Sequence, residues 1–165
     1  METIYFKGNA CHTYGLMPRA GKEAPCFTLT SKDLAEVRCT DFPGRKIVLN
    51  VFPSLDTPVC AASVRRFNEE AAKRPDVTVI DVSMDLPFAQ QRFCAAEGID
   101  NCIVASAFRS PMFGQEYGLQ IVDGPLAGLL ARAVIIIDED RKGIYADLVE
   151  EITNEPDYEA ALSML

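Results

Sequence analysis

The segment 46–71 constrains the fold of this chain most strongly, because it changes from a strand pattern to a helix pattern within a few residues. Residues 47–52 are mostly β-branched, aliphatic or aromatic, which is typical of a short strand buried on both faces. Pro53 lacks a backbone donor and ends this strand, and a turn follows. We therefore expect a central strand, a turn and then a helix.

The helix is predicted to begin just after the turn. Thr57 suits the N-cap, and Pro58 suits the first helical position because its missing N–H would have no helical partner there. Apolar residues then follow at helical spacing as far as Ala71, which places Cys60 in the first turn. The partial positive charge and free N–H groups of a helix N-terminus favour a thiolate. We expect Cys60 to be an activated nucleophile rather than a small buried apolar residue.

The pattern around this cysteine limits its chemistry. Thioredoxin-like proteins display a C-x-x-C pair on the same strand, turn and helix, whereas Thr57 occupies the first position of that pair here. Because no second thiol lies in the same turn, Cys60 cannot exchange disulfides with a local partner. It needs a resolving thiol from elsewhere in the chain.

Length and charge exclude several classes. With 165 residues the chain can bury one core but not two ordinary ones, so we expect a single domain over residues 1–165. The net charge of −8 argues against binding to nucleic acid or to anionic membranes. The N-terminus has neither the basic nor the apolar region of a signal peptide, so the cytoplasm is the expected location.

The cysteines are expected to be reduced thiols, because no secretory signal accompanies them. There are six, at positions 11, 26, 39, 60, 94 and 102. Their spacing does not match zinc or iron–sulfur sites, so no structural metal is expected. Cys26 and Cys39 are interpreted as packing residues. The only histidine, His12, is far from Cys60 in sequence, which argues against Cys-His and Ser-His hydrolases.

The remaining pattern predicts an α/β fold. Residues 1–15 are expected to form an N-terminal β-hairpin extension that turns at Gly8-Asn9. Further strands are predicted at 26–30, 36–40, 77–83, 102–105, 129–138 and 144–149. Helices are predicted at 87–98 and 157–165, and residues 108–118 are expected to be irregular or helical. Strands that alternate with helices and end in a hairpin and helix indicate a mixed central sheet flanked by helices. Thioredoxin-like topology is the leading candidate.

Arg132 is the second informative residue. It interrupts the apolar run 129–137, where an unpaired charge is costly. The side chain could leave at the sheet edge or pair with an acidic residue. A thiolate at Cys60 would be an attractive alternative partner.

At these residues the chain resembles a known family. The motif P-x-x-x-T-x-x-C, formed by Pro53, Thr57 and Cys60, resembles the peroxidatic motif of peroxiredoxins. Longer segments resemble bacterial thiol peroxidases, the atypical two-cysteine peroxiredoxins: FPSLDTPVCAASVRRFNEEA, DLPFAQQRFCAAEGIDN, DGPLAGLLARAV and EITNEPDYEAAL. The resemblance spans nearly the whole chain, including the predicted hairpin.

The resemblance implies a role for each matching residue. Cys60 would be the peroxidatic cysteine, which attacks the peroxide and becomes a sulfenic acid. Thr57 and Arg132 would stabilise the thiolate and the peroxide, and Pro53 would shield the site from water. Cys94 would be the resolving cysteine that forms an intrachain disulfide with Cys60.

The resemblance also implies a hydroperoxide substrate, thioredoxin as reductant, a homodimer and no cofactor. Cys102 is a rival resolving thiol, although Cys94 lies in the block that matches the family. A peroxide sensor that passes oxidation to a partner protein, and a binding module with an inert cysteine, are alternatives. Because a disulfide needs Cα atoms within about 7 Å, one or both cysteine helices are expected to unwind on oxidation.

The hydroperoxide could carry an alkyl chain, for which the sequence offers apolar residues. Phe88, Phe93 and Leu129 would suit an alkyl chain if they line the site. Their position relative to Cys60 depends on the fold.

Overall fold

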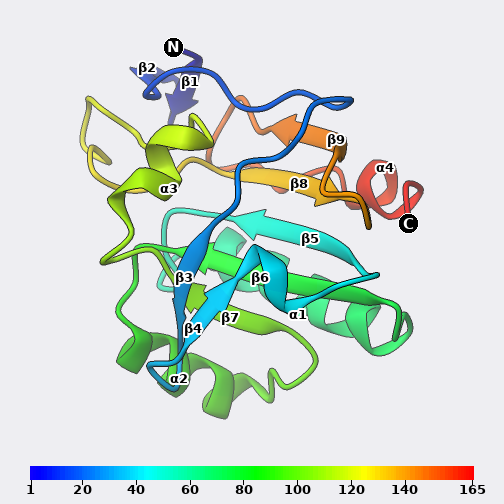
Figure 1. Ribbon diagram of the computed structural model, residues 1–165. Coiled ribbons are helices and arrows are strands. Elements are labelled where there is room, and N and C mark those ends of the chain that lie inside the picture. The colour runs from blue at the N-terminus through cyan, green and yellow to red at the C-terminus, as the bar shows by residue number, and fades with distance from the viewer.

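A seven-stranded mixed sheet forms the centre of the computed structural model, which describes residues 1–165 (Figure 1). In spatial order the strands are β4 (Glu36–Arg38), β3 (Thr28–Ser31), β7 (Ile103–Ser106), β6 (Val77–Ser83), β5 (Lys46–Val51), β8 (Ala133–Ile137) and β9 (Gly143–Leu148). Strands β5, β6 and β7 run parallel, while β3 pairs antiparallel with β7 and β8 pairs antiparallel with β5. This architecture confirms the predicted α/β, thioredoxin-like fold class.

Helices flank this sheet on both faces. The helical elements are α1 (Pro58–Ala72), α2 (Pro87–Glu97), α3 (Pro111–Glu116), α4 (Tyr158–Leu162) and the short 3₁₀ helix η1 (Cys39–Asp41). Helices α1, α2 and α4 lie on one face and α3 lies on the other. Helix α1 lies against β6 and α2 against β7 (Figure 1). Ala161 of α4 packs in one apolar cluster with Phe67 of α1 and with Val48 and Val134 of the sheet. No helix combines the length and apolar character needed to cross a membrane.

Side chains of the central strand β5 divide the core in two. Val48 points to α1 and α4, whereas Ile47, Leu49 and Val51 belong to a larger cluster on the opposite face. Such alternation follows from the two-residue period of a strand. The larger cluster also contains Phe113 of α3. The sheet therefore separates two apolar compartments.

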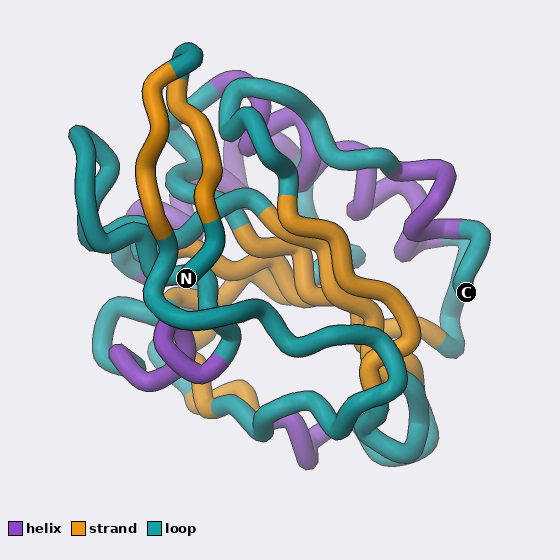
Figure 2. The backbone as a smooth tube through the Cα atoms, turned by 90° about the horizontal axis from the view of Figure 1, so that it is seen from above, coloured by secondary structure: helices purple, strands orange, loops and turns teal.

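The predicted N-terminal hairpin is present and is formed by β1 (Thr3–Phe6) and β2 (Asn9–His12) (Figure 2). Its turn lies at Lys7-Gly8, one residue earlier than predicted, because both residues adopt positive φ angles of 51° and 81°. Their backbone N–H groups donate to the Glu151 carboxylate over 3.0 and 3.1 Å. The bond from Gly8 is the main cause that lowers the pKa of Glu151. The hairpin is thereby tied to the segment after β9.

The strand predicted at 129–138 is shorter in the structure and begins at Ala133. Leu129 and Ala131 instead bond to the segment 119–121, with Ile121 N–H donating to the Leu129 carbonyl and Ala131 N–H to the Leu119 carbonyl. Arg132 is consequently the residue just before β8 rather than one inside a strand.

The interpretation of Cys26 and Cys39 as reduced packing residues is wrong, because they form a disulfide with a Cα–Cα distance of 5.4 Å. The antiparallel register that places Thr28 opposite Arg38 brings the chain before β3 next to the chain after β4. Strand pairing between distant segments creates this proximity, and the spacing of cysteines in the sequence does not reveal it. The other four cysteines are free.

Candidate active site

Cys60 lies where the sequence predicts, in the first turn of α1. Thr57 is the N-cap residue and Pro58 begins the helix. The Cys60 side chain is fully buried and packs in an apolar cluster with Phe52 and Leu55. The strand β5 and the short turn after it therefore deliver this thiol into a dry environment at the N-terminus of a helix.

Arg132 is brought to the same point from a distant part of the chain. Its Nη2 lies 3.1 Å from Cys60 Sγ, across 72 positions of sequence. The antiparallel register places Ala133 opposite Val51, so the residue before β8 lies beside the end of β5, where the turn into α1 begins. Of the partners considered for Arg132, the structure selects the sulfur of Cys60.

The Arg132 guanidinium is held in a fixed orientation. Its Nε donates to the Ile152 carbonyl over 2.8 Å, and the side chain is only 2% exposed. Its Nη1 is buried and has no hydrogen-bond partner. An unpaired buried donor costs about 1–3 kcal/mol, so this nitrogen is available for an oxygen atom that enters the site.

Pro53 and Thr57 lie beside this pair. Together with Arg132 they line a cavity of about 290 Å³. Although Thr57 occupies the N-cap position, its hydroxyl makes no hydrogen bond to the first turn of α1. The hydroxyl donates instead to the Ser54 carbonyl over 2.9 Å. The cavity thus meets the buried thiol through a proline, a hydroxyl and a guanidinium.

The rest of the cavity wall is largely apolar and comes from several segments. Leu129 lines it, as the sequence suggested, but Phe88 and Phe93 do not. Phe88 is 65% exposed on α2, and Phe93 packs beside the buried cluster that contains Cys94. Phe6 of the N-terminal hairpin and Ile152 line the cavity in place of the two expected phenylalanines. Only the fold could reveal that both ends of the chain contribute to the cavity.

Cys94 and Cys102 differ in their surroundings. Cys94 lies on α2, is 4% exposed, and belongs to the same apolar cluster as Cys60. Burial raises the pKa of the Cys94 thiol. Cys102 precedes β7, and burial together with the Asp81 carboxylate raises its pKa. Cys60, Cys94 and Cys102 are all free thiols in this structure.

Sequence reasoning missed a buried polar chain beneath Cys60. Asn50 donates through Nδ2 to the Asp81 carboxylate over 2.8 Å and to the Ser63 hydroxyl over 3.2 Å. Ser63 donates in turn to the Cys60 carbonyl over 2.8 Å. Burial raises the pKa of Asp81 to about 7. Asn50 and Asp81 each interrupt an apolar run of the sequence, as Arg132 does, so the same signal could have found them.

The family comparisons agree with this geometry. The family model described as Redoxin matches residues 19–162. The crystal structure of a peroxiredoxin-like protein from Aquifex aeolicus has a TM-score of 0.93 and 43% identity, covering 99% of this chain and 95% of that one. A thiol peroxidase from Chromobacterium violaceum has a TM-score of 0.89 over 98% of this chain and 94% of that one, with 21% identity, which supports the fold alone. These matches define a redoxin with the thioredoxin-like fold.

Curated relatives specify the family further. Proteins named thiol peroxidase from Mycobacterium bovis and Mycobacterium tuberculosis are 54% identical over 165 residues, covering 100% of this chain and 99% of each relative. The chain therefore belongs to the thiol peroxidase family, as its motifs indicated.

Proposed function

We propose that this protein reduces hydrogen peroxide and organic hydroperoxides with Cys60 as the peroxidatic cysteine. The observation that carries the proposal is the contact of 3.1 Å between Arg132 Nη2 and Cys60 Sγ at the start of α1. A guanidinium in a buried site can donate charge-assisted hydrogen bonds both to a thiolate and to the oxygen atoms of a peroxide. Pro53 and Thr57 complete the wall through which a peroxide would approach.

The first step would be attack of the Cys60 thiolate on the terminal peroxide oxygen. The S–O bond forms as the O–O bond breaks, and the alcohol or water leaves after taking up a proton, so that Cys60 becomes a sulfenic acid. Arg132 Nη1, which has no other partner, is placed to stabilise the negative charge on the leaving oxygen. The Thr57 hydroxyl can turn from the Ser54 carbonyl toward the peroxide.

Cys94 would resolve the sulfenic acid. Its sulfur attacks the sulfur of Cys60, a disulfide forms, and water leaves. Both cysteines are buried in one apolar cluster, and burial raises the pKa of Cys94, so the thiol must reach a more polar environment before it can react as a thiolate. Local unwinding of α1 or α2 would provide that environment. Thioredoxin would then reduce the disulfide.

The remaining parts of this proposal concern the whole molecule. We take residues 1–165 to act as one domain. The homodimer implied by the family and the cytoplasmic location inferred from the N-terminal sequence stay predictions. Sedimentation at micromolar concentration tests the dimer directly.

Peroxide consumption coupled to thioredoxin and thioredoxin reductase tests the catalytic assignment. We expect repeated turnover by the wild type and by Cys102→Ser, and loss of turnover in Cys60→Ser and Cys94→Ser. Turnover that is lost in Cys102→Ser but kept in Cys94→Ser would reassign the resolving thiol. One stoichiometric oxidation without turnover in the wild type would favour the peroxide-sensing relay instead.

A further inference from the structure

The Cys26–Cys39 disulfide lies on the other face of the sheet from Cys60. Cys39 packs in the large cluster with Ile47 and Leu49 of β5, whereas Cys60 packs in the compartment on the side of α1 and α2. The central sheet stands between the two sulfur sites, so direct exchange between them within one folded chain is excluded. A thiol from another molecule can instead approach the disulfide from the side of the exposed Cys26.

The two sulfur atoms of this disulfide differ in access. Cys26 is exposed, whereas Cys39 is only 7% exposed. Thiol–disulfide exchange requires a thiolate to reach one sulfur, while the other sulfur leaves. Access therefore selects Cys26 as the sulfur attacked and Cys39 as the leaving group.

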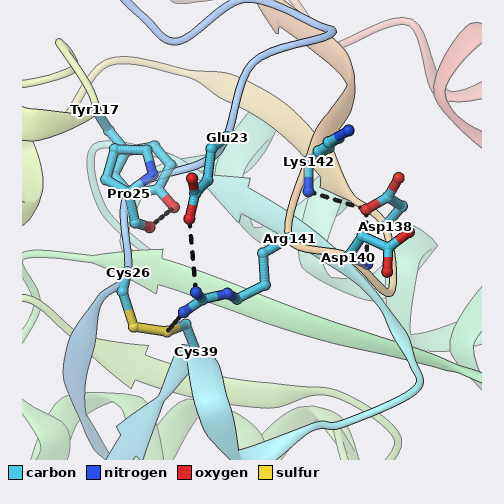
Figure 3. A network of polar contacts seen from close by, with 9 residues as sticks. All are labelled: Glu23, Pro25, Cys26, Cys39, Tyr117, Asp138, Asp140, Arg141 and Lys142. Atoms are coloured by element: carbon cyan, nitrogen blue, oxygen red, sulfur yellow. Dashed lines mark hydrogen bonds and ion pairs between the residues drawn. A yellow bond between two sulfur atoms is a disulfide. The ribbon is translucent and has the colours of Figure 1, made fainter.

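A cation lies beside the leaving sulfur. Arg141 Nη1 is 4.0 Å from Cys39 Sγ, and its Nη2 is 3.5 Å from the Glu23 carboxylate, as Figure 3 shows. A nearby guanidinium stabilises a thiolate, and a more stable thiolate leaves faster. The position of Arg141 thus favours cleavage with Cys39 as the leaving thiolate.

The turn between β8 and β9 fixes the backbone of this arginine. Arg141 has a φ of 62°, a left-handed conformation that is uncommon for a residue with a side chain. The Asp138 carboxylate accepts from the backbone N–H groups of Asp140 and Lys142, each over 2.9 Å (Figure 3). These hydrogen bonds therefore hold the turn in the conformation that directs Arg141 toward the disulfide.

Both cysteines are also held by contacts that do not depend on their bond. The hydroxyl of the buried Tyr117 donates to the Pro25 carbonyl over 2.6 Å (Figure 3). The Ala24 N–H donates to the Arg141 carbonyl over 2.9 Å. Cys39 N–H donates to the Phe27 carbonyl over 3.1 Å. After reduction these contacts keep the two thiols near each other.

We propose that Cys26–Cys39 is a second thiol–disulfide exchange site, which takes two electrons from a dithiol reductant independently of Cys60. One thiolate of the reductant attacks Cys26 Sγ, a mixed disulfide forms, and Cys39 leaves as a thiolate beside Arg141. The second thiol of the reductant then attacks the mixed disulfide, releasing Cys26 and leaving the reductant oxidised. Cys26 and Cys39 each end with one proton.

The test uses the full chain with Cys60→Ser and Cys94→Ser, so that the peroxidase cycle cannot contribute. Trypsin should release Cys26 in peptide 23–32 and Cys39 in peptide 39–45, which allows differential alkylation to follow each thiol by mass spectrometry. Dithiothreitol and thioredoxin serve as separate reductants, which distinguishes a small dithiol from a protein. A thioredoxin whose second active-site cysteine is replaced by serine should be trapped on Cys26.

A matched pair of variants tests the role of the arginine. Arg141→Gln should slow reduction about three- to tenfold, because the leaving thiolate loses its cation. Lys142→Gln removes the same charge one residue later and should reduce at the unchanged rate. Reduction only in denaturant, trapping on Cys39, or equal rates for the two variants would each overturn the proposal. Since none of these readouts uses peroxide, failure here is distinct from failure of the peroxidase assignment.

Discussion

The molecule contains two arginine–sulfur contacts whose surroundings differ sharply. Arg132 is 2% exposed and lies 3.1 Å from Cys60, whereas the Arg141 side chain is 48% exposed and lies 4.0 Å from Cys39. Water screens the second pair and is excluded from the first. The same two chemical groups therefore interact strongly in one place and only weakly in the other.

The largest expected effect comes from breaking the buried pair. Arg132→Gln should lower the rate of Cys60 oxidation by peroxide by about 10²–10³-fold, the usual loss when a preorganised donor to a developing oxyanion is removed. Single-turnover stopped-flow measurements with the reduced protein give this rate. Arg141→Gln is the control and should oxidise at the wild-type rate, since the sheet separates it from Cys60. Equal losses in the two variants would contradict the comparison.

The Cys26–Cys39 disulfide beside Arg141 should matter more for stability than for peroxide chemistry. Replacing both Cys26 and Cys39 by serine should lower the free energy of unfolding by about 3 kcal/mol, because the disulfide closes a short loop in the unfolded chain. Peroxidase turnover should be retained. Urea unfolding of the variant and the wild type, both without reductant, measures the difference. A stable variant without turnover would show that the two sites are coupled.

The buried chain beneath Cys60 predicts a pH effect. Burial raises the pKa of Asp81 to about 7 in the folded protein, while the pKa of an unfolded aspartate is about 3.9. Between these values the unfolded chain releases a proton that the folded protein keeps, so the free energy of unfolding falls as the pH rises through this window. Asp81→Asn should flatten this decrease, which we expect to be roughly 3 kcal/mol between pH 4.5 and pH 7.5. Urea midpoints at pH 4.5 and pH 7.5 test it, and an unchanged slope would contradict it.

The smallest effect is expected at Thr57. Thr57→Val keeps the shape of the side chain and removes the hydroxyl, so oxidation of Cys60 should slow by about tenfold, the value of one hydrogen bond to a charged group. Thr57→Ser keeps the hydroxyl and should restore most of the rate. Peroxide titration of the two variants in single turnover separates these outcomes. Equal rates for valine and serine would remove Thr57 from the mechanism.

Local signals made the first half of the site predictable from the sequence. Pro53, Thr57 and Pro58 are residues that end strands and begin helices, so the position of Cys60 followed from its neighbours alone. The conflict between a charge and an apolar run singled out Arg132. Its contact with Cys60 could only be suggested, because it depends on the register between β5 and β8.

Long-range pairing explains what the sequence did not reveal. The Cys26–Cys39 bond depends on the register of β3 with β4, and the cavity wall depends on how the hairpin meets residues 150–153. The turn of the hairpin was misplaced because Lys7 adopts a left-handed conformation that glycine and asparagine would ordinarily be expected to provide. Local patterns can identify the elements, but the contacts between them require the fold.

The attachment of the N-terminal hairpin has a practical consequence for anyone who engineers this protein. Phe6 and Lys7 form part of the cavity wall, and the hairpin turn is bonded to Glu151, next to the Ile152 carbonyl that orients Arg132. Deleting the first twelve residues to obtain a smaller catalyst would therefore open the cavity and loosen its guanidinium. The C-terminal end, where α4 packs on the other side of the sheet from the hairpin's core contacts, is the better place for a tag or fusion.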